Sequence, residues 1–190
     1  EKTLPNRQGS RGNPLREDRG ILPRRRSRTS RFFADAMLGS MARKLRAFGF
    51  DTSYFKNGGD HDLIRQAASE RRVILTSDHA LVERARTKGL PALLIVGRSD
   101  GERIGSLMKE AARAEVPLIP GEPLCSVCAS GLLRLAKVDV KGKVPPSVEA
   151  RHRLFYRCKG CGKYYWRGSH WKKLRWLERR LRENQIGTNS

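Results

Sequence analysis

Four aspartates in this basic chain stand at positions where their carboxylates could do chemistry. They are Asp35, Asp60, Asp78 and Asp100. Each follows an apolar, strand-like run or opens a helix-like stretch. Because the carboxyl ends of parallel strands meet at one edge of a sheet, carboxylates placed there can hold divalent metal ions. In a chain of formal net charge +21, such an acidic pocket predicts metal-dependent cleavage of a polyanion.

Each of these aspartates also has a purely structural alternative. For Asp60 and Asp100, a helix N-cap is as well supported as a ligand, and a capping box beginning at Ser99 is one form of that alternative. Asp35 and Asp78 both follow apolar strands, and we expect them to converge at one sheet edge. We therefore assign a catalytic Mg²⁺ or Mn²⁺, as one or two ions, to Asp35 and Asp78.

All four cysteines lie in two C-x-x-C pairs that are separated by 29 residues. They are Cys125, Cys128, Cys158 and Cys161. Small residues and glycine after each pair let backbone N–H groups turn toward the sulfurs. This pattern is typical of a four-thiolate zinc ribbon, with two disulfides or a redox dithiol as alternatives. Four thiolates close the coordination shell, so we expect one structural Zn²⁺, which leaves His152 and His170 for surface or substrate contacts.

Positive charge is concentrated at the two ends of the chain. Residues 1–31 carry ten Lys/Arg against three acids, and residues 151–190 carry twelve against two. Residues 32–124 are nearly neutral, with fourteen basic and twelve acidic side chains. Because basic ends attract phosphate backbones through counterion release, we expect a nucleic-acid partner. A merely soluble surface or adhesion to anionic lipid is the alternative.

The elements that must position these side chains alternate between strand-like and helix-like patterns. Short strands are expected at residues 32–33, 52–55, 73–76 and 93–96. Helices are expected at residues 38–48, 60–68, 80–87 and 104–114. This alternation predicts an α/β fold with a parallel sheet that is covered on both faces, over residues 31–121.

Prolines and a glycine near residue 120 mark a domain boundary. Beyond it we expect the zinc ribbon at residues 122–170 and a basic terminal helix and tail at residues 171–190. Residues 1–30 lack apolar periodicity, so we expect a disordered basic tail. Because no apolar run approaches the ~20 residues that span a bilayer, and no intact signal peptide is present, we expect no membrane partner and a cytoplasmic location, with an organelle as alternative.

Three strings of residues resemble one known protein family. F-A-D-A-M-L-G-S-M-A-R-K-L-R-A-F-G-F-D-T-S-Y occupies residues 33–54, R-V-I-L-T-S-D occupies residues 72–78, and Y-Y-W-R-G-S-H-W occupies residues 164–171. In this order they resemble the Mut-seven C-terminal RNase family, which combines a PIN-like fold with an appended zinc ribbon. The resemblance covers about residues 31–177.

The resemblance implies a metal-dependent endoribonuclease. Asp35 and Asp78 match the acidic positions of the family directly. Asp60 matches the acid that opens the second helix, with Asp62 as an alternative register, and Asp100 is a weaker match for a fourth acid.

One residue departs from the family pattern. The family commonly carries a basic residue before the acid of the L-T-x-D motif, and this chain has Ser77 there. The competing hypothesis is therefore a non-catalytic RNA- or ribosome-binding protein with a vestigial nuclease site. A DNA nuclease is a third, because metal-assisted hydrolysis of a phosphodiester does not need the 2′-hydroxyl.

Basic side chains and aromatic rings near these motifs are candidates for RNA contacts. The predicted RNA-binding residues are Arg24, Arg25, Arg26, Arg43, Lys44, Lys163, Arg167, His170, Lys172, Lys173 and Arg175. Arg46 shares the polar face of the first helix, where we expect it to be solvated. Tyr164, Tyr165 and Trp166 could stack on bases, with packing in the ribbon core as the alternative.

Overall fold

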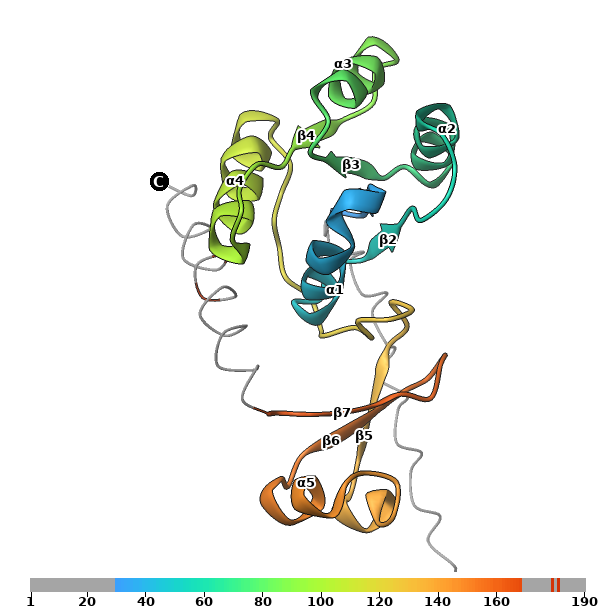
Figure 1. The fold of residues 1–190 in the computed structure, drawn as a ribbon, viewed down its shortest axis with the longest axis vertical. Coiled ribbons are helices and arrows are strands. Elements are labelled where there is room, and N and C mark those ends of the chain that lie inside the picture. The colour runs from blue at the N-terminus through green and yellow to red at the C-terminus, as the bar shows by residue number, and fades with distance from the viewer. Residues whose placement is uncertain (1–29, 169–178, 180, 182–190) are drawn as a thin grey trace, which may run out of the picture.

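The structure is a computed structural model that describes residues 30–168, 179 and 181 (Figure 1). Its larger part contains a four-stranded parallel sheet with the order β2-β1-β3-β4. The strands are β1 (Phe32–Ala34), β2 (Thr52–Tyr54), β3 (Val73–Thr76) and β4 (Ala92–Leu94). Because β1 lies between β2 and β3, Phe32 is in register with both Thr52 and Val73.

Helices cover both faces of this sheet. One face packs against α1 (Gly39–Ala47), which follows the short 3₁₀ helix η1 (Ala36–Leu38), and against α4 (Asp100–Arg113). The other face packs against α2 (Asp60–Glu70) and α3 (His79–Thr87). Phe32 and Ala34 enter the first core and Phe33 enters the second, so every side chain of β1 is buried. The prediction of an α/β fold with a parallel sheet is confirmed.

The side on which the chain adds its next strand to the sheet changes between β1 and β3. The chain leaves β1 through α1 toward β2, whereas it leaves β3 through α3 toward β4 on the opposite side. Since α1 and α3 also lie on opposite faces, the loops that follow β1 and β3 diverge from one point. Ligands of open α/β sheets bind at such a switch point, beyond the carboxyl ends of the strands.

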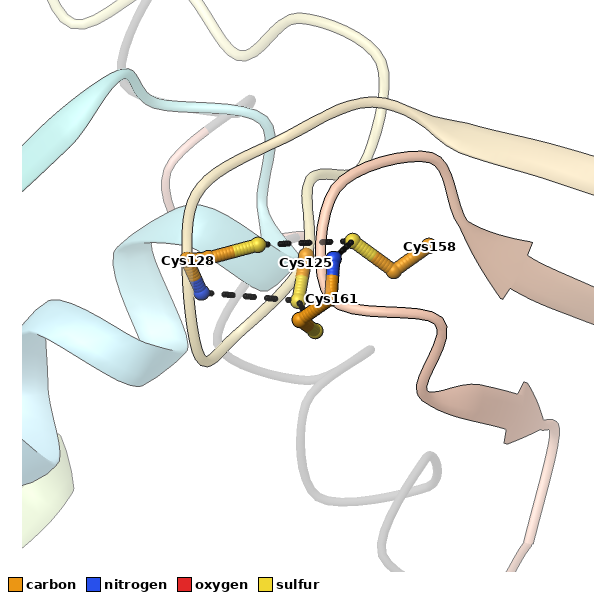
Figure 2. A group of neighbouring side chains, drawn as sticks. All are labelled: Cys125, Cys128, Cys158 and Cys161. Atoms are coloured by element: carbon orange, nitrogen blue, oxygen red, sulfur yellow. Dashed lines mark hydrogen bonds between the residues drawn. The ribbon is translucent and has the colours of Figure 1, made fainter.

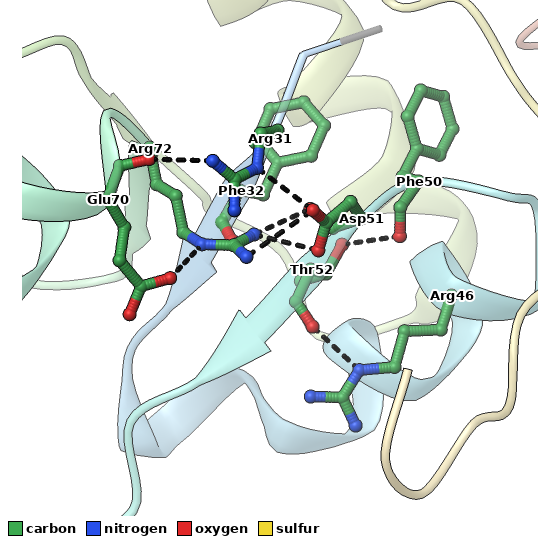
Figure 3. A network of polar contacts seen from close by, with 8 residues as sticks. All are labelled: Arg31, Phe32, Arg46, Phe50, Asp51, Thr52, Glu70 and Arg72. Carbon is green, nitrogen blue, oxygen red and sulfur yellow. Dashed lines mark hydrogen bonds and ion pairs between the residues drawn. The ribbon is translucent and has the colours of Figure 1, made fainter. Parts of the chain in front are cut away.

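The amino end of the same sheet is closed by a network of arginines (Figure 3). Arg72 is 6 % exposed and donates hydrogen bonds to the carboxylates of Asp51 at 2.9 Å and Glu70 at 2.5 Å. Its guanidinium also donates to the backbone carbonyls of Phe32 and Asp51, both at 3.2 Å. Arg31 Nε donates to Asp51 from the other side at 2.9 Å. These contacts tie the beginnings of β1, β2 and β3 together.

The smaller part of the molecule is a three-stranded antiparallel sheet with the order β5-β6-β7. Its strands are β5 (Leu132–Leu135), β6 (Phe155–Cys158) and β7 (Tyr164–Trp166). The 3₁₀ helix η2 (Lys137–Val140) and the short helix α5 (Pro146–Arg151), which the sequence did not lead us to expect, lie between β5 and β6. Val140, Val144 and Phe155 form its small core. Figure 1 shows this sheet beyond the end of α1, apart from the parallel sheet.

Several predictions concern residues outside the described part of the chain. The predicted disordered tail lies there apart from residue 30, and so does most of the predicted terminal helix. Leu181, which is described, is helical, 1 % exposed and packed in the core beneath α1 and α4. The helices of the described residues include none that is long and apolar enough to cross a membrane.

Candidate functional site

Asp35 is held at the carboxyl end of β1 by contacts to both of its carboxylate oxygens. Its backbone N–H donates to the carbonyl of Leu75 on β3 at 2.9 Å, which continues the pairing of the two strands. Oδ1 accepts from the backbone N–H of Ala36 at 2.5 Å, and Oδ2 accepts from the hydroxyl of Thr76 at 2.9 Å. The carboxylate is therefore oriented by the backbone on one side and by β3 on the other.

Thr76 connects Asp35 with Asp78. Its side chain is buried, and its Oγ1 also accepts a hydrogen bond from the backbone N–H of Asp78 at 3.1 Å. Asp78 is the N-cap of α3, and its Oδ1 accepts from the backbone N–H of Ala80 at 2.7 Å. The two aspartates that follow β1 and β3 are thus joined through one threonine at the switch point of the sheet.

An arginine links Asp60 to Asp78. Arg84 of α3 donates from Nη2 to Asp60 Oδ2, and the same nitrogen lies 3.9 Å from Asp78 Oδ2. All three side chains are about half exposed, so a solvated cation lies between two carboxylates. Asp62, the alternative register, instead pairs with Arg65 of its own helix at 2.8 Å. Of Asp60 and Asp62, Asp60 is therefore the residue that lies toward Asp78.

Asp100 has a different partner. Its Oδ1 lies 3.0 Å from Lys44 Nζ, and Lys44 also donates to Ser40 Oγ at 2.6 Å. Asp100 is the first residue of α4, and Ser99 and Glu102 form the capping box expected before that helix. Among the described residues, no hydrogen bond or ion pair joins Asp100 to the other three aspartates, and its metal role stays a prediction.

The capping roles differ from the alternatives that the sequence suggested. Gly59 and Ser99 are the N-caps of α2 and α4, so the interpretation of Asp60 and Asp100 as caps is wrong. Of the aspartates discussed, those whose side chains cap a helix are Asp35 and Asp78, on η1 and α3. Each uses one oxygen for the cap, while the second oxygen of Asp35 meets Thr76 and that of Asp78 faces Arg84. A cap and a functional carboxylate are compatible in one residue.

The four cysteines form a compact group (Figure 2). The distance is 3.6 Å from Cys125 Sγ to Cys161 Sγ and 3.4 Å from Cys128 Sγ to Cys158 Sγ, and all four sulfurs lie within 4.8 Å of one another. Four Zn–S bonds of about 2.3 Å at tetrahedral angles would separate the sulfurs by about 3.8 Å. A disulfide would need about 2.05 Å, so the disulfide alternative is wrong, and all four cysteines are free. The group fits the predicted zinc ribbon.

Backbone and hydroxyl groups surround the sulfurs with hydrogen bonds. The backbone N–H groups of Gly160 and Cys161 both donate to Cys158 Sγ at 3.3 Å, and that of Cys128 donates to Cys125 Sγ at 3.5 Å. Hydrogen bonding with the hydroxyl and backbone of Ser130 lowers the pKa of Cys128 to about 5. Zinc binds the thiolate form of cysteine, and hydrogen bonds of this kind stabilise that form.

Within the described part of the chain, these cysteines are the one group of three or more potential ligands so closely spaced. The aspartates are spread more widely, because Thr76 and Arg84 lie between their carboxylates. The two candidate metal sites therefore differ in kind. The thiolates are already gathered, whereas the carboxylates are linked through other side chains.

A family model of the Mut7-C RNAse domain matches residues 30–177 of the chain. The chain belongs to the Mut7-C RNAse domain family. Its matched range includes the linked aspartates and the four cysteines alike, as the resemblance implied. Searches among curated proteins and among solved structures gave no match.

Arg46 joins the two parts of this Mut7-C domain. Its side chain is buried, and it donates from Nε to the carbonyl of Thr52 at 2.7 Å. Its Nη1 donates to the carbonyls of Ser126 and Val127, between the first two cysteines, at 3.1 and 2.8 Å. Burial lowers the pKa of Arg46. The expectation that Arg46 is solvated is wrong, because the ribbon packs over this position of α1.

The sequence patterns did not identify Thr76 and Arg84 as site residues of the Mut7-C domain. Thr76 carries a weak signal, since it is a polar residue that ends a buried apolar strand beside the acidic motif. Arg84 carries none, because an arginine on the exposed side of a helix is ordinary in a chain with 40 Lys and Arg. Its role depends on how α2 and α3 pack side by side on one face of the sheet.

Four of the predicted RNA-binding residues line one cleft between α1 and the ribbon. They are Arg43, Lys44, Lys163 and Arg167. The others lie outside the described residues: Arg24, Arg25, Arg26, His170, Lys172, Lys173 and Arg175.

Proposed function

We propose that this protein is a metal-dependent endoribonuclease that hydrolyses phosphodiester bonds at the carboxyl edge of its parallel sheet. The observation that carries the proposal is the junction of Asp35 and Asp78 through Thr76 at the switch point. The family supports it, because a Mut7-C RNAse domain is a ribonuclease type of domain. Asp60 belongs to the site through its link to Arg84.

The donor set fits Mg²⁺ or Mn²⁺. Asp35, Asp60 and Asp78 supply carboxylate oxygens, the ligands that these hard cations prefer, and solvent can complete the coordination because the side chains are accessible. The approach of Asp60 and Asp78 to one guanidinium supports a cation position between them. When bound, such ions act as Lewis acids toward the scissile phosphate.

The residues of the chain prepare this position for the metal. The hydroxyl of Thr76 and the N–H of Ala36 fix the direction of the Asp35 carboxylate. The N–H of Ala80 fixes one oxygen of Asp78 and leaves the other oriented toward Arg84. Arg84 balances the negative charge of Asp60 and Asp78, the charge that a divalent ion would neutralise if these carboxylates held it. Held in this way, the ligands need little reorganisation.

In this proposal the substrate is RNA in the cytoplasm. The basic ends of the chain supply phosphate contacts that do not depend on sequence, and the nearly neutral middle carries the site. The four-cysteine zinc ribbon holds its own zinc ion apart from the catalytic metal.

The test is a cleavage assay on single-stranded and structured RNA with Mn²⁺ or Mg²⁺. We expect Asp35→Asn and Asp78→Asn to lower the cleavage rate by more than about a hundredfold, since loss of residues that merely orient metal ligands already costs 10–100-fold. Asp62→Asn is the matched control, because it removes the same charge from a carboxylate that pairs with Arg65 on α2. Unchanged cleavage by Asp35→Asn would refute the proposal.

The competing function is that of a non-catalytic RNA- or ribosome-binding protein. Arg84 favours it, because this side chain already neutralises the two carboxylates where a metal would bind. Ser77, in place of the usual basic residue, favours it too. RNA binding by the wild-type protein, without cleavage in either metal, would establish this function instead.

A further inference from the structure

A cleft lies between the parallel-sheet part of the molecule and the ribbon. Its volume is about 790 Å³. This lies within the range of about 300–1,000 Å³ that is typical of clefts that hold ligands. Ser40, Arg43 and Lys44 of α1 form part of one wall, together with Asp100 at the start of α4. The cleft is separate from the linked aspartates Asp35, Asp60 and Asp78.

The opposite wall is one face of the ribbon sheet. Tyr156 of β6 and Tyr165 of β7 are directly paired across the antiparallel strands, so their rings lie on the same face. Both line the cleft together with Leu132 of β5, which is on that face as well. Tyr164 and Trp166 reach its margin, but they pack against the ribbon core on the other face. Of the aromatic residues that we predicted to stack, Tyr164 and Trp166 thus belong mainly to the core.

Hydrogen bonds and strand pairing hold the rings of the aromatic wall. The hydroxyl of Tyr165 lies 3.0 Å from Cys125 Sγ and 3.3 Å from Ser126 Oγ, so the zinc site anchors this ring. Tyr156 is half-buried and has Tyr165 as its neighbour on β7. Rings held in this way present flat apolar surfaces at little entropic cost, which is what stacking on an unpaired base requires.

The charge around these rings is positive. Arg43, Lys44, Lys163 and Arg167 line the cleft, and among its described lining residues Asp100 is the one acid. Lys44 is bound to Asp100 at 3.0 Å, while Lys163 Nζ lies 6.0 Å from the centre of the Tyr165 ring. Cationic groups beside aromatic faces match a polynucleotide, whose phosphates and bases alternate along the strand.

We propose that this cleft binds a single-stranded segment of RNA, with bases stacked on Tyr156 and Tyr165 and phosphates held by Arg43 and Lys163. The choice of RNA rests on the proposed function, whereas the requirement for a single strand rests on the cleft itself. A duplex keeps its bases stacked on one another, so it cannot use the aromatic wall. The helix α1, which forms a wall of the cleft, also begins just after Asp35 and η1.

Binding is measured with the full chain carrying Asp35→Asn and Asp78→Asn, so that cleavage does not interfere, using a fluorescent single-stranded RNA of 12 nucleotides. We expect Tyr156→Ala to weaken binding by about fivefold or more, the loss typical of one stacked base. Tyr156→Phe keeps the ring and should bind within about twofold of the parent. Circular dichroism and zinc content of Tyr156→Ala establish that it is folded.

The phosphate contacts are tested through salt dependence. We expect Arg43→Ala with Lys163→Ala to reduce the slope of log affinity against log salt by about 1.4, because each single-strand phosphate contact contributes about 0.7. The matched control is Lys137→Ala with Lys141→Ala, which removes the same charge from exposed ribbon residues outside the cleft. This control should leave the slope within about 0.3 of the parent.

Several results would overturn the proposal. One is unchanged RNA affinity of Tyr156→Ala. Another is an equal reduction of the salt slope in the control pair Lys137→Ala with Lys141→Ala. A third is equally tight binding of duplex RNA or of single-stranded DNA with the same sequence. Failure of the cleavage assay is a separate result, because binding is measured with a protein that cannot cleave. A wild-type protein without cleavage activity whose RNA binding still depends on Tyr156 would refute the nuclease and support the cleft.

Discussion

The amino and carboxyl ends of the four-stranded sheet both pair arginines with carboxylates, yet the two arrangements differ in burial and completeness. At the amino end, Arg72 is 6 % exposed, and its guanidinium meets two carboxylates and two backbone carbonyls. At the carboxyl end, Arg84 has 51 % of its side chain exposed and lies between Asp60 and Asp78. Arg72 is therefore enclosed by the protein, whereas Arg84 is accessible to solvent.

This contrast shows how the same residue types form an enclosed structural contact at one end and an accessible, exchangeable contact at the other. Removing one partner of a buried ion pair costs about 3–5 kcal/mol, because the remaining charges stay behind unpaired. Exposed pairs contribute about 0–1 kcal/mol, because water replaces the lost partner. The amino end can therefore lock the strands together. The carboxyl end can exchange its arginine for another cation at little cost in stability.

The largest expected effect is a difference in the free energy of unfolding between a variant of Arg72 and a variant of Arg84. We expect Arg72→Met to lower the free energy of unfolding by about 3 kcal/mol, near the lower limit for a buried pair because Asp51 and Glu70 are about 40 % exposed. Arg84→Met should change it by less than about 1 kcal/mol. Urea denaturation of both variants is the measurement. Equal losses would mean that the carboxyl end is as structural as the amino end.

A smaller effect concerns metal affinity at the carboxyl end. We expect Arg84→Met to bind Mn²⁺ about thirtyfold more tightly than the wild type, because two unit charges about 4 Å apart in water repel by about 1 kcal/mol and Mn²⁺ carries two charges. Calorimetric titration of Mn²⁺ measures it. Arg65→Met is the control, since it removes the same charge from the pair with Asp62. Weaker binding by Arg84→Met would indicate that this arginine helps to build the site.

The smallest effect is a pH dependence at the amino end. Burial acts to raise the pKa of Asp51, but hydrogen bonds from Arg72 and Arg31 outweigh it and hold the pKa below the usual 3.8. A lowered folded-state pKa means that the unfolded chain binds the proton more readily, so the contribution is complete above pH 3.8 and is lost as the pH falls through the folded value.

We expect this contribution to be about 1 kcal/mol or less, because the Asp51 side chain is 42 % exposed and solvent screens the pair. The measurement is the free energy of unfolding between pH 5 and pH 2 for the wild type and Asp51→Asn. The difference in the free energy of unfolding between the two proteins should decrease as the pH falls. A difference that does not vary with pH would show that the charge of Asp51 does not stabilise the fold.

The sequence predicted those features that local patterns encode. The spacing of the cysteines was sufficient for the zinc ribbon, because two C-x-x-C turns leave few other arrangements of four thiolates. Asp35 and Asp78 could be placed at one edge because each lies within two residues of the end of an apolar strand of a parallel sheet. The α/β fold followed from the alternation of strand and helix patterns.

Other features could not be read from the sequence, because they depend on pairs of residues that are distant along the chain. Arg46 resembles its solvated neighbours on α1, and only the packing of the ribbon buries it against the carbonyls of Ser126 and Val127. The pairing of Lys44 with Asp100 depends on how α1 and α4 lie on the same face. The cleft between α1 and the ribbon likewise exists only once the two parts have docked.

By itself, the sequence determined the grouping of the four cysteines, the α/β architecture and the position of two aspartates at the strand ends. Each of these depends on residue type and spacing over a few positions. The tertiary structure alone decided that Asp60 joins Asp78 through Arg84, that Asp100 belongs with Lys44, and that Tyr156 faces α1. The physical reason is that these pairings depend on the relative positions of packed helices and sheets, which no local pattern of residues records.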